Sequence, residues 1–103
     1  MRDSLLWLVT LARKAGKAYT GAFLSERAVK SGRARLVIIA ADASDNTKKK
    51  FYDCCAYCGT ACFEYASKEL LARYTGKENV SVIAVTDENF ARGIEGKFKE
   101  MKN

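Results

Sequence analysis

The chain has 103 residues, 49% of them hydrophobic and 29% charged, and it contains no histidine. This length suits one hydrophobic core, so we expect a single domain over residues 1–103, and no stretch is polar enough to be disordered. Eighteen Lys and Arg against twelve Asp and Glu leave a net charge of +6, which favours a polyanionic partner such as nucleic acid.

The same sequence argues against a membrane protein. No apolar run approaches the roughly 18 to 20 residues that span a bilayer. The run from Leu5 to Ala12 is short, follows Asp3 and lacks a small-residue cleavage site, so it does not fit a signal peptide. We therefore expect a cytoplasmic protein whose four cysteines are thiols.

Periodicity and capping residues divide the chain into alternating helices and strands. The apolar residues after Ser4 recur at helical spacing until Gly16, and Ser4 is in position to cap that helix. The five apolar residues LVIIA, 36–40, predict a buried strand. Four further helices are expected: one over 21–31, one from a Ser44 cap to about Cys58, one from a Ser67 cap to Gly76, and one after an Asp87 cap. Gly59, which follows Cys58, is expected in the left-handed conformation that ends a helix. Further strands are expected over 17–20, 61–65 and 80–85.

The order of these elements predicts the fold class. Strands that alternate with helices, one of them apolar at every position, are typical of a sheet covered on both faces. We therefore expect an α/β fold, a three-layer α/β/α sandwich with a central mixed four-stranded sheet. The final helix should pack through one apolar stripe, which comprises Phe90, Ile94, Phe98 and Met101.

The four cysteines, Cys54, Cys55, Cys58 and Cys62, include one C-x-x-C, and four thiolates suffice in principle for zinc or an iron–sulfur cluster. All four lie within nine residues, however, whereas four-cysteine sites usually draw their ligands from two separated knuckles. Cys54 and Cys55 are about 100° apart on a helix, while Cys55 and Cys58 share the face of Phe51. We expect the thiols to pack in the core, with a metal or redox role as the alternative.

Residues for catalysis are scarce. Without histidine the most common general base at neutral pH is missing, and no nucleophile motif is present. The acidic pairs Asp42 with Asp45 and Asp87 with Glu88 stand at helix starts, where capping and the helix dipole explain them. We expect no enzymatic activity, no cofactor and no small-molecule substrate.

The positive charges gather near the ends of predicted elements. The lysines 48–50 spread through about 200° of helix, so they cannot all face one ligand. In a sandwich of this kind the start of the second helix, the loop 41–47 and the loop 76–80 reach one edge, where amides and cations together would bind phosphates. Other cations near helix ends are Arg13, Lys14, Lys17, Arg27, Lys30, Lys68 and Lys77, while Lys97, Lys99 and Lys102 are expected to be solvated surface.

Three segments resemble a known family: LARKAGK (11–17), TGAFLSERAVKSGRARLVIIAADASDNTKKKF (20–51) and TGKENVSVIAVTDENFA (75–91). They are similar, in the right order and over almost the whole chain, to the bacterial YlxQ-type branch of the superfamily of ribosomal proteins L7Ae and L30e. The resemblance implies a three-layer α/β/α fold that binds structured RNA, in the best-known members a kink-turn with sheared G·A pairs. It also implies a ribosomal or ribosome-associated role in translation, with ribosomal RNA or translation factors as partners.

The family pattern that reads the RNA, Gly-x-Asn-Glu-x-x-Lys, falls on residues 21–27. Gly21 and the final cation, here Arg27, are kept, but Phe23 and Leu24 replace the Asn-Glu pair. Asn and Glu side chains hydrogen-bond base edges, which Phe and Leu cannot do. Phe23 lies one turn from Arg27 on the same helix face, where it would either stack on a base or cover the short strand.

We therefore interpret the chain as an RNA-binding protein of a ribonucleoprotein. The alternatives are a protein-interaction adaptor on the same fold, or a cysteine-based metal or redox protein. The resemblance also assigns RNA contacts to the loop after the strand 36–40, to the start of the fourth helix and to the loop 76–80. The residues expected to contact RNA are Lys17, Gly21, Ala22, Phe23, Leu24, Arg27, Asp42, Ser44, Asn46, Lys48, Lys68, Gly76, Lys77, Asn79 and Val80.

Overall fold

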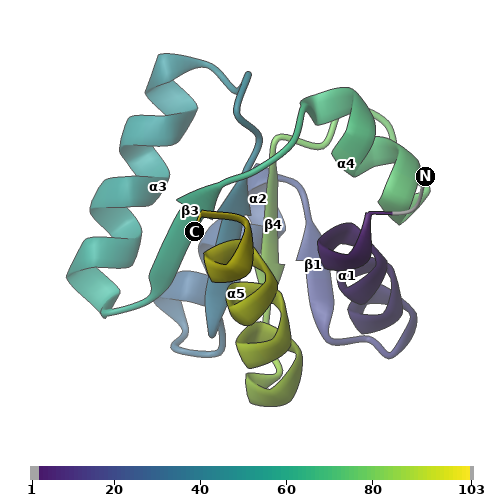
Figure 1. The fold of residues 1–103 in the computed structure, drawn as a ribbon. Coiled ribbons are helices and arrows are strands. Elements are labelled where there is room, and N and C mark those ends of the chain that lie inside the picture. Colours follow the sequence, from purple (N-terminus) through teal and green to yellow (C-terminus); the bar gives the residue numbers. More distant parts are fainter. Residues whose placement is uncertain (1–2, 103) are drawn as a thin grey trace.

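A computed structural model of the chain describes residues 3–102, in which five helices alternate with four strands (Figure 1). Every predicted element is present, with ends shifted by up to a few residues. The helices are α1 (Ser4–Lys14), α2 (Ala22–Lys30), α3 (Asp45–Cys58), α4 (Lys68–Thr75) and α5 (Glu88–Lys102), and the strands are β1 (Ala18–Thr20), β2 (Leu36–Ile39), β3 (Ala61–Glu64) and β4 (Val82–Val85).

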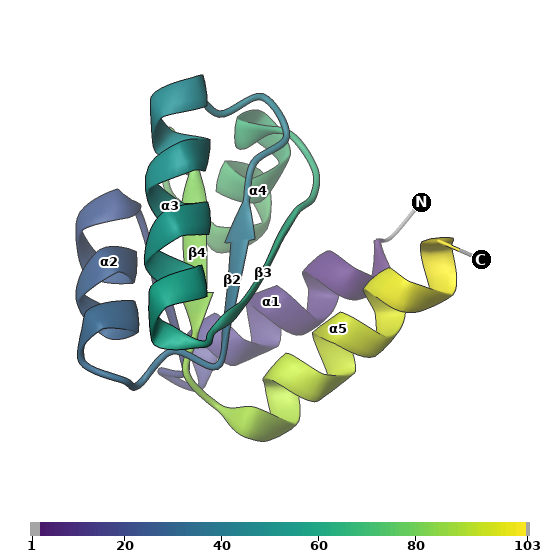
Figure 2. The same cartoon turned by 90° about the vertical axis from the view of Figure 1, so that its left-hand side faces the viewer.

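Helices cover both faces of the sheet. Figure 2 shows α2 and α3 on one face and α1, α4 and α5 on the other. The strand order is β1-β4-β2-β3, and the central strands β4 and β2 are buried at every position. The predicted three-layer α/β/α sandwich with a mixed four-stranded sheet is confirmed. Among the described residues, no helix combines the length and the apolarity needed to cross a membrane.

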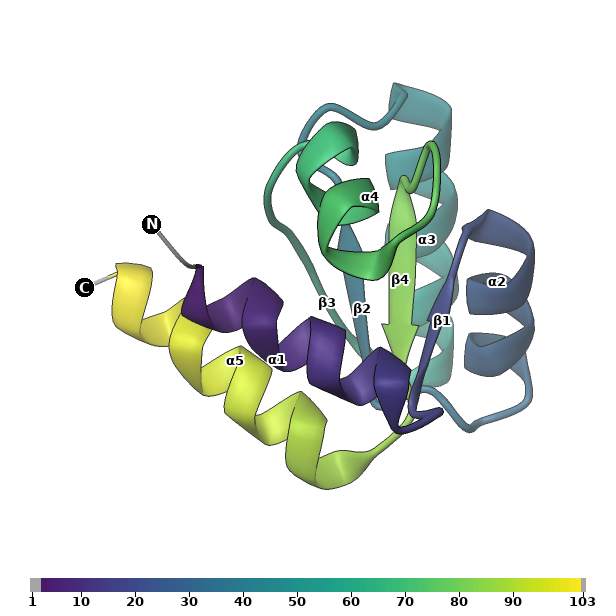
Figure 3. The same ribbon diagram turned by 90° about the vertical axis from the view of Figure 1, so that its right-hand side faces the viewer.

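Strand directions decide which loops share an end of the sheet. β1 and β2 both run antiparallel to β4, and β2 runs parallel to β3. β1, β2 and β3 therefore end where β4 begins, and we call this the carboxyl end of the sheet (Figure 3). It carries the starts of α2, α3 and α4 and the loop that leads into β4. The opposite, amino end carries the turn 15–17, the loop 31–35 and the start of α5.

The cap of α1 is Asp3 and not Ser4, so that prediction was wrong. Asp3 Oδ1 accepts a hydrogen bond from the Leu6 N–H at 2.9 Å, and its Oδ2 accepts one from the Tyr65 hydroxyl at 2.7 Å. The Asp3 N–H donates to the Tyr74 hydroxyl at 3.0 Å. Two distant tyrosines thus select the cap, which shifts Ser4 into the first turn. The predicted caps Ser44, Ser67 and Asp87 are confirmed.

α5 packs against α1 and the edge strand β3 through an apolar stripe that is shorter than predicted. Ile94 is fully buried, and the Phe98 ring stacks on Phe63 with 3.9 Å between centroids. Met101, expected in the same stripe, is 50% exposed because it lies near the end of the helix, beyond these contacts.

The four cysteines differ in burial. Cys55 is in the core and Cys54 and Cys62 are half-buried, but Cys58 is exposed, so the expectation of core packing was wrong for Cys58. Cys58 is the last residue of α3, at the end of the face that Cys55 buries. A hydrogen bond with Cys62, and then burial, raise the pKa of the Cys55 thiol, which keeps it neutral. Within residues 3–102, no group of three or more His, Cys, Asp or Glu is arranged to hold a metal ion.

Candidate nucleic-acid interface

The start of α2 lies at the carboxyl end of the sheet and has no side-chain cap. Gly21 occupies the N-cap position with a φ of 97°, and its N–H donates to the Val82 carbonyl at 2.8 Å. Glycine adopts such a positive φ without the steric cost that a Cβ would bring. Because no side chain of the described residues accepts from the first amides of α2, these amides are left for water or an anionic ligand.

Two large apolar side chains are exposed on the first turn of α2. Phe23 is 70% exposed and Leu24 is 44% exposed. The Arg27 guanidinium lies 5.7 Å from the centroid of the Phe23 ring, within the range of a cation–π contact. Arg27 forms no ion pair with the described residues, so its charge is available. The ring and the guanidinium together offer a surface on which a base can stack.

The loop between β2 and α3 is held on two sides. The Ala40 N–H donates to the Ser81 carbonyl at 2.7 Å, which fixes the loop against the residue that precedes β4. On the other side, Asp42 Oδ1 accepts from the backbone N–H of Lys68 at 2.8 Å. The loop is therefore tied to both the α4–β4 segment and the start of α4.

The first turn of α3 follows this loop. Ser44 Oγ accepts from the Thr47 N–H at 3.2 Å, so capping already uses this hydroxyl. Asn46 is exposed and forms no side-chain hydrogen bond with the residues that the structure describes. Its amide can both donate and accept, which suits contact with an RNA base or sugar.

The three lysines at 48–50 are each paired with a carboxylate. The Nζ–O distances are 3.2 Å for Lys48 with Glu64, 2.9 Å for Lys49 with Asp53 and 2.9 Å for Lys50 with Glu26. A hydrogen bond from the Tyr52 hydroxyl, and then Lys48, hold the pKa of Glu64 below its ordinary value. Hydrogen bonds from Lys30 and then Lys50 do the same to the pKa of Glu26. The lysine run therefore presents less free charge than the sequence indicates.

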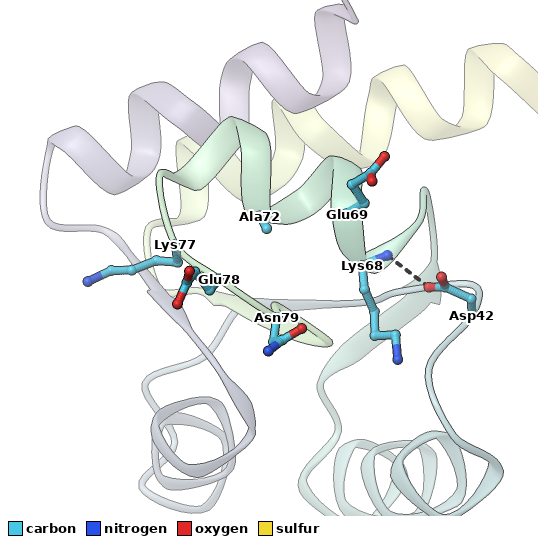
Figure 4. Close-up of a pocket in the computed structure, with 7 residues that line it drawn as sticks. All are labelled: Asp42, Lys68, Glu69, Ala72, Lys77, Glu78 and Asn79. Carbon is cyan, nitrogen blue, oxygen red and sulfur yellow. Dashed lines mark hydrogen bonds between the residues drawn. The ribbon is translucent and has the colours of Figure 1, made fainter.

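A hollow of about 460 Å³ opens between the β2–α3 loop, the first turns of α4 and the α4–β4 loop (Figure 4). In this view Asn79 lies between Lys68 and Glu78, and Asn79 has a φ of 51°, a left-handed conformation that asparagine tolerates. Acidic, basic and amide groups line the same space, so it offers the donors and acceptors that an unpaired base requires. The lining residues are Asp42, Lys68, Glu69, Ala72, Lys77, Glu78 and Asn79.

The structure brings most of the predicted contact residues together at the carboxyl end. Val80 lies there too, but it is only 2% exposed, so only its backbone is available. Lys17 lies elsewhere, because its carbonyl accepts from the Thr86 N–H at 2.8 Å at the amino end. The residues at the carboxyl end are Gly21, Ala22, Phe23, Leu24, Arg27, Asp42, Ser44, Asn46, Lys48, Lys68, Gly76, Lys77 and Asn79.

Three residues that line the hollow were not anticipated from the sequence: Glu69, Ala72 and Glu78. One local signal was present for Ala72, which follows Lys68 by four residues and so shares its helix face. Glu69 and Glu78 each neighbour a predicted contact residue in the chain. Only the approach of α4 to the loop before β4 shows that they border one space.

Residues 3–94 match the ribosomal protein L7Ae/L30e/S12e/Gadd45 family. The chain belongs to this family. The RNA-binding protein YlxQ of Bacillus subtilis strain 168 is 40% identical over 87 residues, which are 84% of this chain and 87% of that protein. The RNA-binding protein YlxQ of Enterococcus faecium is 36% identical over 91 residues, which are 88% of this chain and 87% of that protein.

Two solved structures share the L7Ae/L30e fold of this chain. A Bacillus halodurans protein of unknown function superposes with a TM-score of 0.91 at 32% identity, over 95% of this chain and 99% of that one. The Giardia lamblia 15.5kD RNA binding protein superposes with a TM-score of 0.78 at 26% identity, over 97% of this chain and 92% of that one. The resemblance to the YlxQ-type branch, drawn from three sequence segments, is therefore confirmed.

Proposed function

We propose that this L7Ae/L30e-family protein binds structured RNA at the carboxyl end of the sheet and performs no catalysis. The observation that carries the proposal is the meeting of three features at one end of the sheet. They are a helix start without a side-chain cap, an exposed ring beside an arginine that has no ion pair among the described residues, and a hollow of mixed charge. Relatives that are named RNA-binding proteins support it, among them YlxQ at 40% identity.

Each part of the surface has a role in this proposal. The first amides of α2 and the Arg27 guanidinium bind backbone phosphates, because helix starts and cations both favour anions. Phe23 stacks on an unpaired base, and the hollow beside Asn79 takes a second extruded base. The protein therefore recognises the shape of a folded RNA, and the family resemblance favours ribosomal RNA within a ribonucleoprotein.

Recognition of sheared G·A pairs by hydrogen bonds to base edges is not part of this mode. Phe23 and Leu24 occupy the two positions where the family pattern has Asn and Glu, and neither side chain can hydrogen-bond a base. We expect a kink-turn RNA and an RNA that keeps the same bent shape but has other pairs in place of the G·A pairs to bind with similar affinity. The double substitution Phe23→Asn, Leu24→Glu should create a preference for the intact kink-turn.

The experiment is a titration of both RNAs, at one salt concentration, with the natural protein and with the double variant. Similar affinities for the natural protein, and a preference for G·A pairs in the variant, would support the proposal. Absence of binding to either RNA and to ribosomal RNA would contradict RNA binding and favour the protein-interaction adaptor. A strong G·A preference in the natural protein would leave RNA binding in place and overturn the stacking mode.

A further inference from the structure

Positive charge is distributed unevenly between the two ends of the sheet. At the carboxyl end, lysines 48–50 are paired and Lys68 and Lys77 share their hollow with three acidic residues. At the amino end four cations are exposed and form no ion pair with any residue in the described part of the chain. We call these cations the amino-end basic surface: Lys14, Lys17, Arg33 and Arg35.

Hydrogen bonds to the end of β4 hold the two segments of this surface side by side. The Thr86 N–H donates to the Lys17 carbonyl at 2.8 Å, and the Arg35 N–H donates to the Val85 carbonyl at 2.7 Å. Because Val85 and Thr86 are consecutive, the turn after α1 and the loop after α2 flank one point of the backbone (Figure 3). The four charges therefore form one surface, although they come from two separate segments.

Arg33 is positioned by aromatic and polar contacts. Its guanidinium carbon lies 5.4 Å from the centroid of the Tyr19 ring, and its Nε donates to Ser31 Oγ at 3.1 Å. Tyr19 is on the edge strand β1, between the amino-end basic surface and Gly21. A guanidinium held over a ring keeps its planar fork pre-organised for a phosphate.

The fold offsets part of this charge. α1, α2 and α3 all end at the amino end, and a helix carboxyl terminus is equivalent to about half a negative charge. Asp87 adds a full negative charge at the start of α5. The amino terminus of that helix is equivalent to about half a positive charge. Against four full positive charges these leave an excess of about two. The four cations therefore carry more positive charge than is needed to neutralise the helix ends and Asp87.

We propose that the amino-end basic surface is a second RNA contact, which binds backbone phosphates of an RNA whose folded part occupies the carboxyl end. This proposal rests on the proposed function. Lys17 and Gly21 are four positions apart along an extended chain, or about 13 Å, so one RNA arm that passes the β1 edge reaches both surfaces. Base recognition belongs to the carboxyl end, and most of the salt-dependent attraction belongs to the amino end.

RNA fits this surface better than a protein does. Protein interfaces centre on buried apolar and aromatic anchors and are depleted of lysine. Neither of the two segments, 14–17 and 32–35, has an exposed large apolar side chain. Lysine and arginine with small residues between them are instead what a phosphate backbone attracts, and such contacts carry no sequence preference.

The test compares two variants that each lose four positive charges. The first replaces Lys14, Lys17, Arg33 and Arg35 with Gln, and the matched control replaces Lys49, Arg73, Lys97 and Lys99 with Gln. Circular dichroism and thermal melts establish that both fold. Affinity for a kink-turn RNA with long helical arms, and for the same RNA with trimmed arms, is measured from low to physiological salt.

We expect the first variant to lose about tenfold or more in affinity for the long-armed RNA, and its slope of log K against log salt to fall by about 3, since each phosphate contact contributes about 0.7 to 0.9. With trimmed arms the first variant and the control should bind alike. If the two variants have equal slopes on the long-armed RNA while the natural protein binds it, the second contact does not exist and RNA binding itself stands. If the natural protein binds neither RNA, both proposals fail.

Discussion

The carboxylate of Asp42 accepts a hydrogen bond from the backbone N–H of Lys68 at 2.8 Å, across 26 positions of the sequence. This bond joins the β2–α3 loop to the first turn of α4, and both segments border the hollow at the carboxyl end (Figure 4). Because it uses only the backbone of Lys68, the side chain of that residue remains available to a ligand.

Asp42→Ala should lower the free energy of unfolding by about 1 kcal/mol, the usual contribution of one hydrogen bond, and weaken RNA binding by loosening two rims of the hollow. Asp42→Asn retains an acceptor oxygen and should keep most of the stability and most of the RNA affinity. Urea unfolding and an RNA titration measure the effects. Equal stability and affinity in Asp42→Ala and the natural protein would show that the bond does not organise the site.

Phe23→Ala should weaken RNA binding by about 1 to 3 kcal/mol, the range for stacking of one base on an aromatic side chain. Stability should change by less than about 0.5 kcal/mol, because the ring is 70% exposed. Tyr57→Ala is the control, since Tyr57 is a 94% exposed aromatic residue on the last turn of α3. The same titration serves both variants, and equal losses would remove Phe23 from the interface.

Arg27→Ala should weaken RNA binding by about 1 to 3 kcal/mol more than Lys99→Ala, although each removes one charge. Arg27 lies one turn after Phe23 and has no carboxylate partner among the described residues, so its fork is free for a phosphate. Lys99 is exposed on α5, and charges farther from the RNA than about 8 Å are screened at physiological salt. An equal effect of the two would indicate a diffuse field in place of a local site.

Asp3→Ala should lower the free energy of unfolding by about 1 kcal/mol or more, because it removes the α1 cap and the partner of the Tyr65 hydroxyl. Ser4→Ala should be close to neutral, since Ser4 is exposed and does not cap the helix. Thermal or urea unfolding separates the two. The reverse order of effects would restore Ser4 as the cap.

Stability should fall as the pH rises from about 10 to 12. Burial, and then the hydrogen bond to Asp3, raise the pKa of Tyr65 to about 12 from its ordinary 10.0. Because the folded pKa is the higher one, the contribution of Tyr65 is complete below pH 10 and is lost as the pH approaches 12. Tyr65→Phe should be less stable at neutral pH and lose less stability over this interval. Parallel pH profiles for the two proteins would contradict this assignment.

The elements and their order follow from the sequence alone, because the signals for them are local. The caps Ser44 and Ser67 act within one turn, and Gly59 and Gly76 end their helices by a left-handed conformation that also needs no distant partner. The apolar run 36–40 predicted a strand buried on both faces. Alternation of strands and helices then leads to a layered α/β fold with few other solutions.

Part of the candidate site was also predicted from the sequence. Contacts at the start of α2 and in the two loops were inferred because these segments reach one edge in a sandwich of this kind, and because the family resemblance assigns contacts to them. The tertiary structure alone showed Val80 to be buried and Glu69, Ala72 and Glu78 to line the hollow. Burial and lining depend on how α4 packs over the loop, which no local pattern records.

The positions of the charges depend on how the chain folds and are not apparent from the sequence. Lys17 and Gly21 are four positions apart, but an extended strand advances about 3.3 Å per residue, so β1 delivers them to opposite ends of the sheet. The pairing of Lys48 with Glu64, and the choice of Asp3 over Ser4 as a cap, depend on partners that are distant in the sequence. Such contacts form when packed elements bring side chains together. The spacing of residues along the chain does not predict the distance between side chains that are far apart in the sequence.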